Sequence, residues 1–316
     1  MNSAVASNSD GKSLERTRLN FSVMITTRNR LEDLKRTIQV MKQLDPQPSE
    51  ILITADGCTD DTTTLVRKEL PSARLFVNAV RRGSVASRDR MMREATGDLV
   101  LALDDDSYPE QTDCLNRLAK LFSERPNLAV VHFPQHTDEY PETLSRTDFA
   151  PAGLTRSFAN SGACLRRSIY LELPGFVPRF FHMYEEPDYG LQCVASGYEV
   201  YYTPLITIRH HWSGQSRSNL RNHRRHARNE LWSTLMRCPF PYSAGLVSYR
   251  IFSQFRFACK QGFGWAIQEP AWWFQALAGI PYCLRHCRPY AWEDYKRWLR
   301  LPDSLSAPVR GHSSEP

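Results

Sequence analysis

Three consecutive carboxylates, Asp104, Asp105 and Asp106, follow an uncharged apolar run over residues 99–103. Carboxylates this close repel one another unless a cation or hydrogen-bond donors offset their charge. A divalent ion such as Mg²⁺ does so, because one or two carboxylates and substrate phosphates together hold it. The apolar run is typical of a strand buried on both faces, and ligands of open α/β sheets lie beyond the carboxyl ends of such strands. The triplet indicates either a metal and phosphate site or a solvated acidic turn.

Strand and helix patterns alternate four times up to this triplet. Apolar, β-branched runs predict strands over 21–27, 51–54, 73–78 and 99–103, and helical spacing predicts helices over 31–44, up to 70 and over 85–95. This order predicts a mostly parallel sheet flanked by helices. Polar clusters follow the first, second and fourth strands, so we expect them at one edge of the sheet. A dinucleotide-binding Rossmann domain is disfavoured, because no G-x-G-x-x-G follows the first strand.

Composition sets broad limits on the class of protein. The chain has 316 residues, a net charge of +6 and eight cysteines without paired short spacings. The modest basic excess suits phosphate-bearing ligands or an anionic membrane surface, and we expect no nucleic-acid partner. The cysteine pattern and the lack of a secretory apolar region favour a cytoplasmic protein, either free or peripheral at the inner face of the membrane.

Several motifs occur in a specific order between Phe21 and Trp232: ITTRNR, ADGCTDDT, ATGDLVLALDDD, SGACLRRSIYLELPGF, MYEEPDYGLQCVASGYEVYYTP and RHHWSGQS. In this order they resemble the family 2 glycosyltransferases of GT-A fold, in the rhamnosyltransferase-like subgroup. The resemblance implies a GT-A Rossmann-like sheet with a C-terminal helical extension. It also implies a hexosyl or deoxyhexosyl transferase that uses a nucleoside diphosphate sugar and a divalent metal, Mg²⁺ or Mn²⁺.

The resemblance also implies roles for individual residues. Nucleotide-sugar binding falls to residues of the first, second and fourth strand ends and to one helical arginine: Thr26, Thr27, Arg28, Arg30, Asp56, Arg88, Asp104 and Asp105. Ala55 stands where the family often has a carboxylate, so Asp56 is expected to contact the base alone. Asp106 is the expected direct metal ligand, with Asp104 beside it. His210 and His211, after a strand predicted over 200–208, are further candidate metal ligands.

An acidic stretch, Glu185-Glu186-Pro187-Asp188, matches the family's E-D-x-D motif with Glu at the second position. A transferase that inverts the configuration at the anomeric carbon needs a carboxylate to deprotonate the acceptor hydroxyl. We predict Glu186 as this base. Glu185 and Asp188 remain alternative bases. Both could instead stabilise the N-terminus of a helix that continues through Ala195, since acidic residues favour that position.

The last quarter of the chain has a different composition. Aromatic residues alternate with arginine and lysine from Tyr242 to Leu301, which suits either an interfacial membrane contact or packing against the catalytic domain. Four arginines precede this region at helical spacing and offer a site for an anion or a solvated basic face: Arg217, Arg221, Arg224 and Arg228. We predict a disordered segment over 1–19, a glycosyltransferase domain over 20–235, a helical extension over 236–302 and a disordered tail over 303–316.

Three function classes follow. The first is a metal-dependent inverting glycosyltransferase that acts on a hydroxyl of a glycan or lipid-linked acceptor in cell-surface polysaccharide synthesis. The second is a sugar nucleotidyltransferase, which should carry a glycine-rich phosphate loop that ITTRNR lacks. The third is a non-catalytic relative that binds nucleotide sugars or carbohydrate, which predicts nucleotide binding without turnover.

Overall fold

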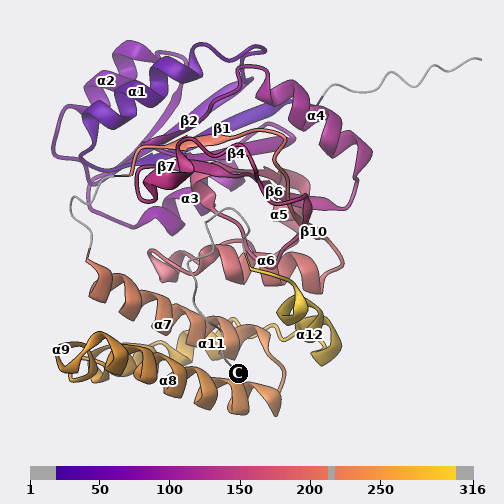
Figure 1. The fold of residues 1–316 in the computed structure, drawn as a ribbon. Coiled ribbons are helices and arrows are strands. Elements are labelled where there is room, and N and C mark those ends of the chain that lie inside the picture. Colours follow the sequence, from indigo (N-terminus) through magenta and orange to yellow (C-terminus); the bar gives the residue numbers. More distant parts are fainter. Residues whose placement is uncertain (1–18, 213–217, 304–316) are drawn as a thin grey trace, which may run out of the picture.

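The computed structural model describes residues 19–212 and 218–303, and the predicted terminal segments lie almost entirely outside them. An α/β part comes first and a layer of helices follows it (Figure 1). The α/β part contains, in chain order, β1 (Phe21–Thr27), α1 (Leu31–Met41), β2 (Glu50–Asp56), α2 (Thr62–Glu69), β3 (Arg74–Asn78), α3 (Ser84–Glu94), β4 (Leu99–Asp104), β5 (Ser107–Pro109), α4 (Cys114–Glu124), β6 (Leu128–His132), β7 (Gln135–Thr137), β8 (Gly153–Leu154), β9 (Ala163–Arg166), α5 (Arg167–Glu172), α6 (Glu185–Ala195), β10 (Glu199–Tyr202) and β11 (Ile208–His210). Three short 3-10 helices lie between these elements, η1 (Pro141–Thr143), η2 (Asn160–Gly162) and η3 (Pro178–Phe180).

The main sheet has eight strands in the order β3-β2-β1-β4-β9-β6-β10-β8. The first four of these pair in parallel, as the alternating sequence pattern predicts. β9 runs antiparallel to both of its neighbours, and β8 runs antiparallel to β10, so the sheet is mixed but mostly parallel. The strand predicted over 200–208 is wrong in one respect: β10 ends at Tyr202, and β11 joins β5 and β7 in a second, three-stranded sheet.

Side chains alternate between the two faces of the main sheet, because successive strand residues point in opposite directions. In β1 and β4, Val23 and Leu101 pack with α1 and α4, whereas Met24 and Val100 belong to the cluster on the opposite face. All of them are buried. The continuous apolar runs of the sequence therefore reflect a sheet covered on both sides.

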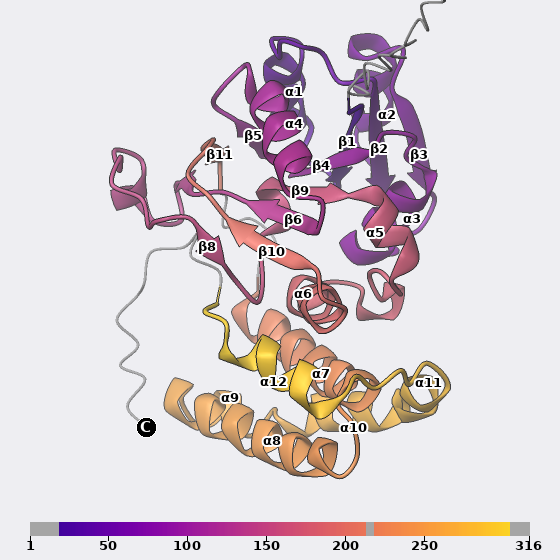
Figure 2. The ribbon, with the colours of Figure 1, turned by 90° about the vertical axis from the view of Figure 1, so that its right-hand side faces the viewer.

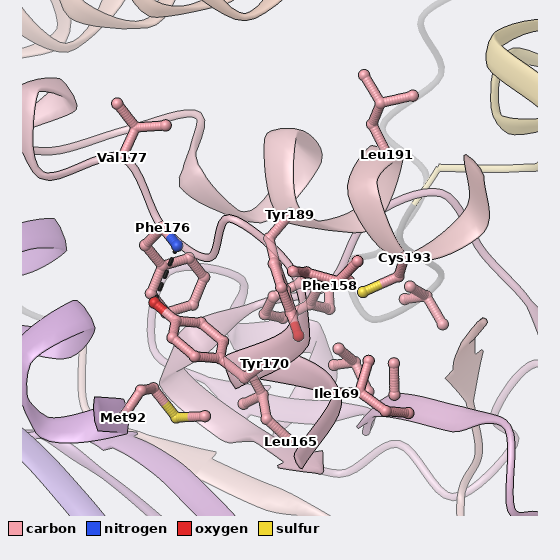
Figure 3. Close-up of a cluster of buried hydrophobic side chains, with 14 of the residues drawn as sticks. Met92, Phe158, Leu165, Ile169, Tyr170, Phe176, Val177, Tyr189, Leu191 and Cys193 are labelled. Carbon is pink, nitrogen blue, oxygen red and sulfur yellow. Dashed lines mark hydrogen bonds between the residues drawn. The ribbon is translucent and has the colours of Figure 1, made fainter. Parts of the chain in front are cut away.

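Aromatic side chains fill the face of the sheet that turns toward α5 and α6 (Figure 3). The ring of Tyr170 contacts those of Phe176 and Tyr189 at centroid distances of 5.2 and 5.1 Å. The Tyr170 hydroxyl accepts a hydrogen bond from the backbone N–H of Phe176 and donates one to Asp89. This cluster fixes α6, which carries the acidic stretch, against the sheet.

The C-terminal layer consists of α7 (Asn219–Arg237), α8 (Tyr242–Gln261), α9 (Phe263–Ala266), α10 (Pro270–Ala278), α11 (Ile280–Arg285) and α12 (Trp292–Arg300). It lies on the α6 side of the sheet (Figure 2). Trp298 donates a hydrogen bond to the carbonyl of Arg156, so α12 is tied to the α/β part. All seven tryptophans of the chain lie between residues 212 and 298. Among the described residues, no helix is both long and apolar enough to cross a membrane.

The predicted boundary between residues 235 and 236 lies inside α7, which packs against α8, α10 and α11. Tyr295 and Trp298 of α12 share one buried cluster with Met24 and Val100 of the sheet. The division of the chain into a catalytic domain and an extension therefore stays a prediction.

Candidate active site

One cavity of about 360 Å³ opens at the carboxyl ends of β1, β2 and β4. It is bounded by these strand ends, by the N-terminal turns of α3 and α6, and by one face of α7. The predicted residues that line it are Thr26, Thr27, Arg28, Arg30, Asp56, Arg88, Asp104, Asp105, Glu185, Glu186, His210 and Arg221. Residues from seven separate elements thus meet at the sheet edge where the strand pattern placed the ends of the first, second and fourth strands.

The three carboxylates of the acidic triplet have different neighbours, because the chain turns sharply after β4. Ligand atoms of Asp104, Asp106 and His210 all lie within 4.8 Å of one another. His210 reaches this position because β11 pairs with β5, directly after the triplet. His210 Nε2 lies 3.3 Å from a carboxylate oxygen of Asp106.

Arg30 offsets the negative charge of Asp105 and Asp106. Its guanidinium lies 3.1 Å from Asp105 and also hydrogen-bonds Asp106. Burial by itself would raise the pKa of Asp106, but His210 and Arg30 hold it below its ordinary value. Burial and the charge of Asp106 raise the pKa of Asp105 to about 7. Asp106 thus stays ionised, as a metal ligand must.

The donor set of Asp104, Asp106 and His210 fits a divalent cation. Carboxylates suit Mg²⁺ and Mn²⁺, and a neutral imidazole is a common additional ligand. His211 does not join this set, although it was predicted together with His210: it shares a hydrogen bond with the Tyr108 hydroxyl and lies 3.5 Å from Asp138. His211 follows the last residue of β11, and its contacts with Tyr108 and Asp138 hold it apart from His210.

Arg88 connects the triplet to the acidic stretch. Its guanidinium donates one hydrogen bond to Asp104 and another, of 3.1 Å, to Glu185. Burial would lower the pKa of Arg88, but the charges of Asp104 and Glu185 raise it above its ordinary value. A single buried cation therefore sets the distance between the metal-ligand candidates and the candidate bases.

The three candidate bases occupy different environments. Glu185 is buried against Arg88, whereas Glu186 is half-buried and lines the cavity. Burial raises the pKa of both, and that of Glu185 to about 8. Asp188 faces away from the cavity: it is buried and accepts hydrogen bonds from Ser233, Gln192 and Arg237. The geometry favours Glu186 among the three candidates and gives Asp188 a role in joining α6 to α7.

A strained loop presents Glu185 and Glu186. Phe181, Met183 and Tyr184 have φ values of 69°, 74° and 70°, which non-glycine residues seldom adopt. The amide of Asn229, on α7, donates hydrogen bonds to the carbonyls of residues 180, 182 and 183. Such strain persists only where surrounding contacts hold it, so α7 helps to fix the acidic stretch.

Asp56 is held in place at the end of β2. Its carboxylate accepts hydrogen bonds from the backbone N–H groups of Arg82 and Gly83 at 2.7 and 2.8 Å, and from Asn78 at 2.9 Å. Gly83 has a φ of 92°, and an added Cβ would lie 2.1 Å from the carbonyl oxygen of Phe181. Only glycine fits this turn, which brings the start of α3 next to Asp56.

Several arginine side chains line the cavity, and the helical spacing of the sequence predicted only some of them. Arg221 lines it, but Arg224 hydrogen-bonds Gln268 and Arg228 hydrogen-bonds the carbonyl of Phe180. Arg217 lies outside the described residues. The prediction missed Arg81 and Arg225, which line the cavity with Arg28 and each lie over the ring of Phe181, at 5.0 and 4.9 Å from its centroid. Burial lowers the pKa of Arg81, and so do the nearby charges of Arg28 and Arg221, so this group is suited to an anion.

Asn160 is another lining residue that the prediction missed. Its side chain is 1% exposed, and no partner among the described residues hydrogen-bonds its amide nitrogen or oxygen. A buried polar group without a partner is costly, and a ligand in the cavity would supply one. The only sequence signal was its position in the NSG turn before Ala163, which is common in turns of any kind.

A family model described as "Glycosyl transferase family 2" matches residues 22–185, which is more than half of the chain. The chain belongs to glycosyl transferase family 2. The matched region begins in β1 and ends at Glu185, so it contains the strand ends, the acidic triplet and Arg88. The predicted family is confirmed. No curated protein sequence matches the chain.

Solved structures of glycosyltransferases share the fold at low sequence identity. S. aureus TarS 1–349 in complex with UDP-GlcNAc is 15% identical, with a TM-score of 0.57 over 85% of this chain and 82% of that one. The mannosyltransferase PcManGT from Pyrobaculum calidifontis, in complex with GDP-Man and Mn²⁺, is 16% identical, with a TM-score of 0.54 over 90% and 86%. GalNAc-T7 with UDP, GalNAc and Mn²⁺ is 14% identical, with a TM-score of 0.57 over 72% of this chain. The chain spans about half the length of that GalNAc-T7 chain, 49%. These likenesses confirm the predicted GT-A-like mixed sheet with a C-terminal helical region.

Proposed function

We propose that this family 2 glycosyltransferase is a metal-dependent inverting enzyme. It transfers a hexosyl or deoxyhexosyl group from a nucleoside diphosphate sugar to a hydroxyl of a glycan or lipid-linked acceptor. The observation that carries the proposal is a single cavity in which Arg88 joins Asp104, of the metal donor set, to Glu185, beside Glu186. Cell-surface polysaccharide synthesis and the rhamnosyltransferase-like subgroup belong to the same proposal.

Asp104, Asp106 and His210 would hold the metal. A bound Mn²⁺ or Mg²⁺ stabilises the negative charge that develops on a diphosphate leaving group. The structures of PcManGT and GalNAc-T7 contain Mn²⁺, which supports this assignment. Arg30 keeps the ligand Asp106 ionised, and Arg88 orients Asp104, so the chain prepares the donor set before a ligand binds.

Glu186 would act as the base toward the acceptor hydroxyl. It lines the cavity, and burial raises its pKa, which improves a carboxylate as a proton acceptor. Glu185 is paired with Arg88, and Asp188 is held by Arg237, so neither is as available as Glu186 to accept a proton from a substrate. The carboxylate of Glu186 would take the acceptor proton while the acceptor oxygen bonds to the anomeric carbon of the sugar. The bond from that carbon to the phosphate oxygen breaks in the same step and releases the nucleoside diphosphate.

The nucleotide would lie along the ends of β1 and β2. Asp56 receives the base edge, Thr26, Thr27 and Arg28 line the base and ribose, and Arg81 with Arg225 faces the phosphates. S. aureus TarS binds UDP-GlcNAc and PcManGT binds GDP-Man, so related folds accept both pyrimidine and purine nucleotides. Donor identity then depends on the loops around Asp56 and Asn160.

The test is nucleoside diphosphate release from a panel of nucleotide sugars, with Mn²⁺ or Mg²⁺ and then with EDTA. We expect release from one donor, its loss in EDTA and its recovery with Mn²⁺. Asp106→Asn and Glu186→Gln should each lower the release rate by about 100-fold or more, with Glu186→Gln still binding the donor. The matched control is Asp113→Asn, since Asp113 only pairs with Arg117 on the surface of α4.

Other outcomes distinguish the alternatives. Donor binding without release across a broad donor and acceptor panel would support a non-catalytic relative. Pyrophosphate formation from a nucleoside triphosphate and a sugar phosphate would support a nucleotidyltransferase. Release that persists in EDTA and in Asp106→Asn would contradict the metal site.

A further inference from the structure

The C-terminal helices expose an unusual set of large apolar side chains. Phe263 is 81% exposed, Phe274 72% and Phe252 63%. We call these residues, together with their exposed neighbours, the outer aromatic surface: Tyr249, Phe252, Phe255, Phe263, Ile267, Phe274, Leu277 and Leu284. Soluble monomers seldom expose large apolar groups in such number within one region, and a region of this kind marks an interaction site.

The surface follows the periodicity of its helices. In α8, Phe252 and Arg256 lie four residues apart on one exposed side, while Val247 and Ile251 on the other side pack near Trp272 and Ala276. The partly exposed Phe255 lies at the border between the two sides and contacts Trp273. Residues 274, 277 and 284 repeat the pattern along α10 and α11 with spacings of three and seven. Helix α8 thus carries apolar side chains on two sides, one packed against the core of the protein and one exposed in the structure of the described residues.

Charge identifies the kind of partner. Between residues 238 and 292 the only acidic residue is Glu269, which is fully buried and bonded to His223 and Trp272. The same segment has four exposed cations: Arg256, Lys260, Arg285 and Arg288. Exposed aromatic residues accompanied by cations and by no exposed carboxylate are typical of interfacial helices that lie on anionic lipid. A second copy of this chain would instead place Arg256 and Lys260 of both copies together without an acid to pair them.

The position of α7 connects this surface to the cavity. Arg221 and Arg225 line the cavity from one side of α7. From the other side, His223 hydrogen-bonds Glu269 at 2.9 Å and Arg224 reaches Gln268 at 2.5 Å, in the segment between α9 and α10. One helix therefore separates the cavity from the helices of the outer aromatic surface. Figure 2 shows these helices on the side of the molecule away from the sheet.

We infer that the outer aromatic surface docks on an anionic lipid bilayer. The rings of α8 to α10 enter the headgroup boundary, and the four exposed cations contact lipid phosphates. The further step, that docking brings a lipid-linked acceptor to the cavity, rests on the proposed function. The docking itself depends only on the surface.

The test is cosedimentation of the full chain with vesicles of phosphatidylcholine alone or of equal parts phosphatidylcholine and phosphatidylglycerol. We expect binding to the mixed vesicles that weakens with salt, and little binding to the neutral ones. The double variant Phe252→Asp with Phe274→Asp should lower the partition coefficient by about tenfold or more, because both rings lose their apolar environment. Its control replaces two exposed leucines elsewhere, Leu144→Asp with Leu171→Asp.

A second pair tests the charge. Arg256→Gln with Lys260→Gln should weaken binding several-fold and reduce its dependence on salt, whereas Arg67→Gln with Lys68→Gln on α2 should change neither. Equal loss in variants and controls would overturn the inference. So would self-association without vesicles that Phe252→Asp with Phe274→Asp abolishes. Donor release is measured on the same samples, so vesicle binding without release would overturn the proposed function and leave the docking surface intact.

Discussion

Asn160 is the residue whose environment most directly predicts a ligand contact. Its amide lies in the cavity, is almost fully buried and has no hydrogen-bond partner among the described residues. We expect Asn160→Ala to lower kcat/KM for the donor by about tenfold, the cost of one or two hydrogen bonds to a sugar hydroxyl. Binding of the nucleoside diphosphate without the sugar should change little, which calorimetry can measure.

The matched control is Asn116→Ala, at an exposed position on α4. An equal fall in affinity for the sugar-free nucleotide would place Asn160 at the nucleotide instead. Unchanged kinetics with a lower free energy of unfolding would show a purely structural role and contradict the prediction.

Among the residues that line the cavity, charged side chains were easier to predict from the sequence than neutral ones. Asp104 and Asp106 were expected because three adjacent carboxylates repel one another without a cation, and Glu186 because its stretch resembles the family's E-D-x-D motif. Asn160 could not, since an Asn-Ser-Gly sequence is an ordinary turn signal. Adjacent histidines gave no basis for choosing between them, and only the pairing of β11 separates His210 from His211.

Asn229 shows how one element controls another. From α7, its amide binds three carbonyls of the strained loop that presents Glu185 and Glu186. We expect Asn229→Ala to lower the free energy of unfolding by about 2 kcal/mol, because buried carbonyls lose their donor. We also expect kcat to fall by about tenfold with little change in the KM for the donor, since the base moves and the nucleotide site does not.

Steady-state kinetics and urea unfolding of the same preparations check this prediction. Asn219→Ala, at the exposed first residue of α7, is the control and should change neither quantity. A rise in KM with kcat preserved would contradict the positioning role, because it would mean that the loop serves donor binding.

The order of elements was largely predictable, whereas long-range pairing was not. Four alternating apolar and helical patterns were enough to predict β1 to β4 and their parallel order. The reversal at β9 depends on a strand of four residues between two parallel neighbours, which no local pattern marks. Spacing alone predicted Arg221, Arg224 and Arg228 on one helical face, but in the folded chain Arg221 lines the cavity and Arg224 does not, whereas Arg225, which the spacing missed, does.

Two histidines far apart in the fold make the stability of the whole molecule depend on pH. Burial lowers the pKa of His132 to about 3 and that of His226 to about 4. His132 Nε2 lies 2.9 Å from the Thr155 hydroxyl, whose proton goes to the carbonyl of Ser157, so Nε2 carries the proton of a neutral ring. Within the described residues, Nδ1 has no acceptor for a second proton. The unfolded chain binds these protons below pH 6.5, whereas the folded chain does not until near pH 4.

These two histidines should therefore lower the stability as the pH drops from about 6.5 toward 4, by about 1 kcal/mol per pH unit for each histidine. Asp105 and Glu185 act in the opposite direction, because their raised pKa values let the folded chain bind protons that the unfolded chain does not, so the histidine contribution is read as the difference between the wild type and the variant. Urea unfolding between pH 7.5 and pH 5 measures this slope. His132→Asn should remove about half of the slope contributed by the two residues. An unchanged slope in that variant would show that the folded protein admits a proton at His132.

The distribution of tryptophan has a spectroscopic consequence. All seven indoles lie between residues 212 and 298, and none belongs to strands β1 to β11. Six of the seven belong to helices α7 to α12, and Trp212 follows β11, so tryptophan emission reports mainly on the helical layer. Trp265 and Trp273 contact Phe257 and Phe255 of α8, so their emission should shift to the blue when those helices enter lipid. The unlabelled protein thus carries its own optical probe in the layer of the molecule that would meet a membrane.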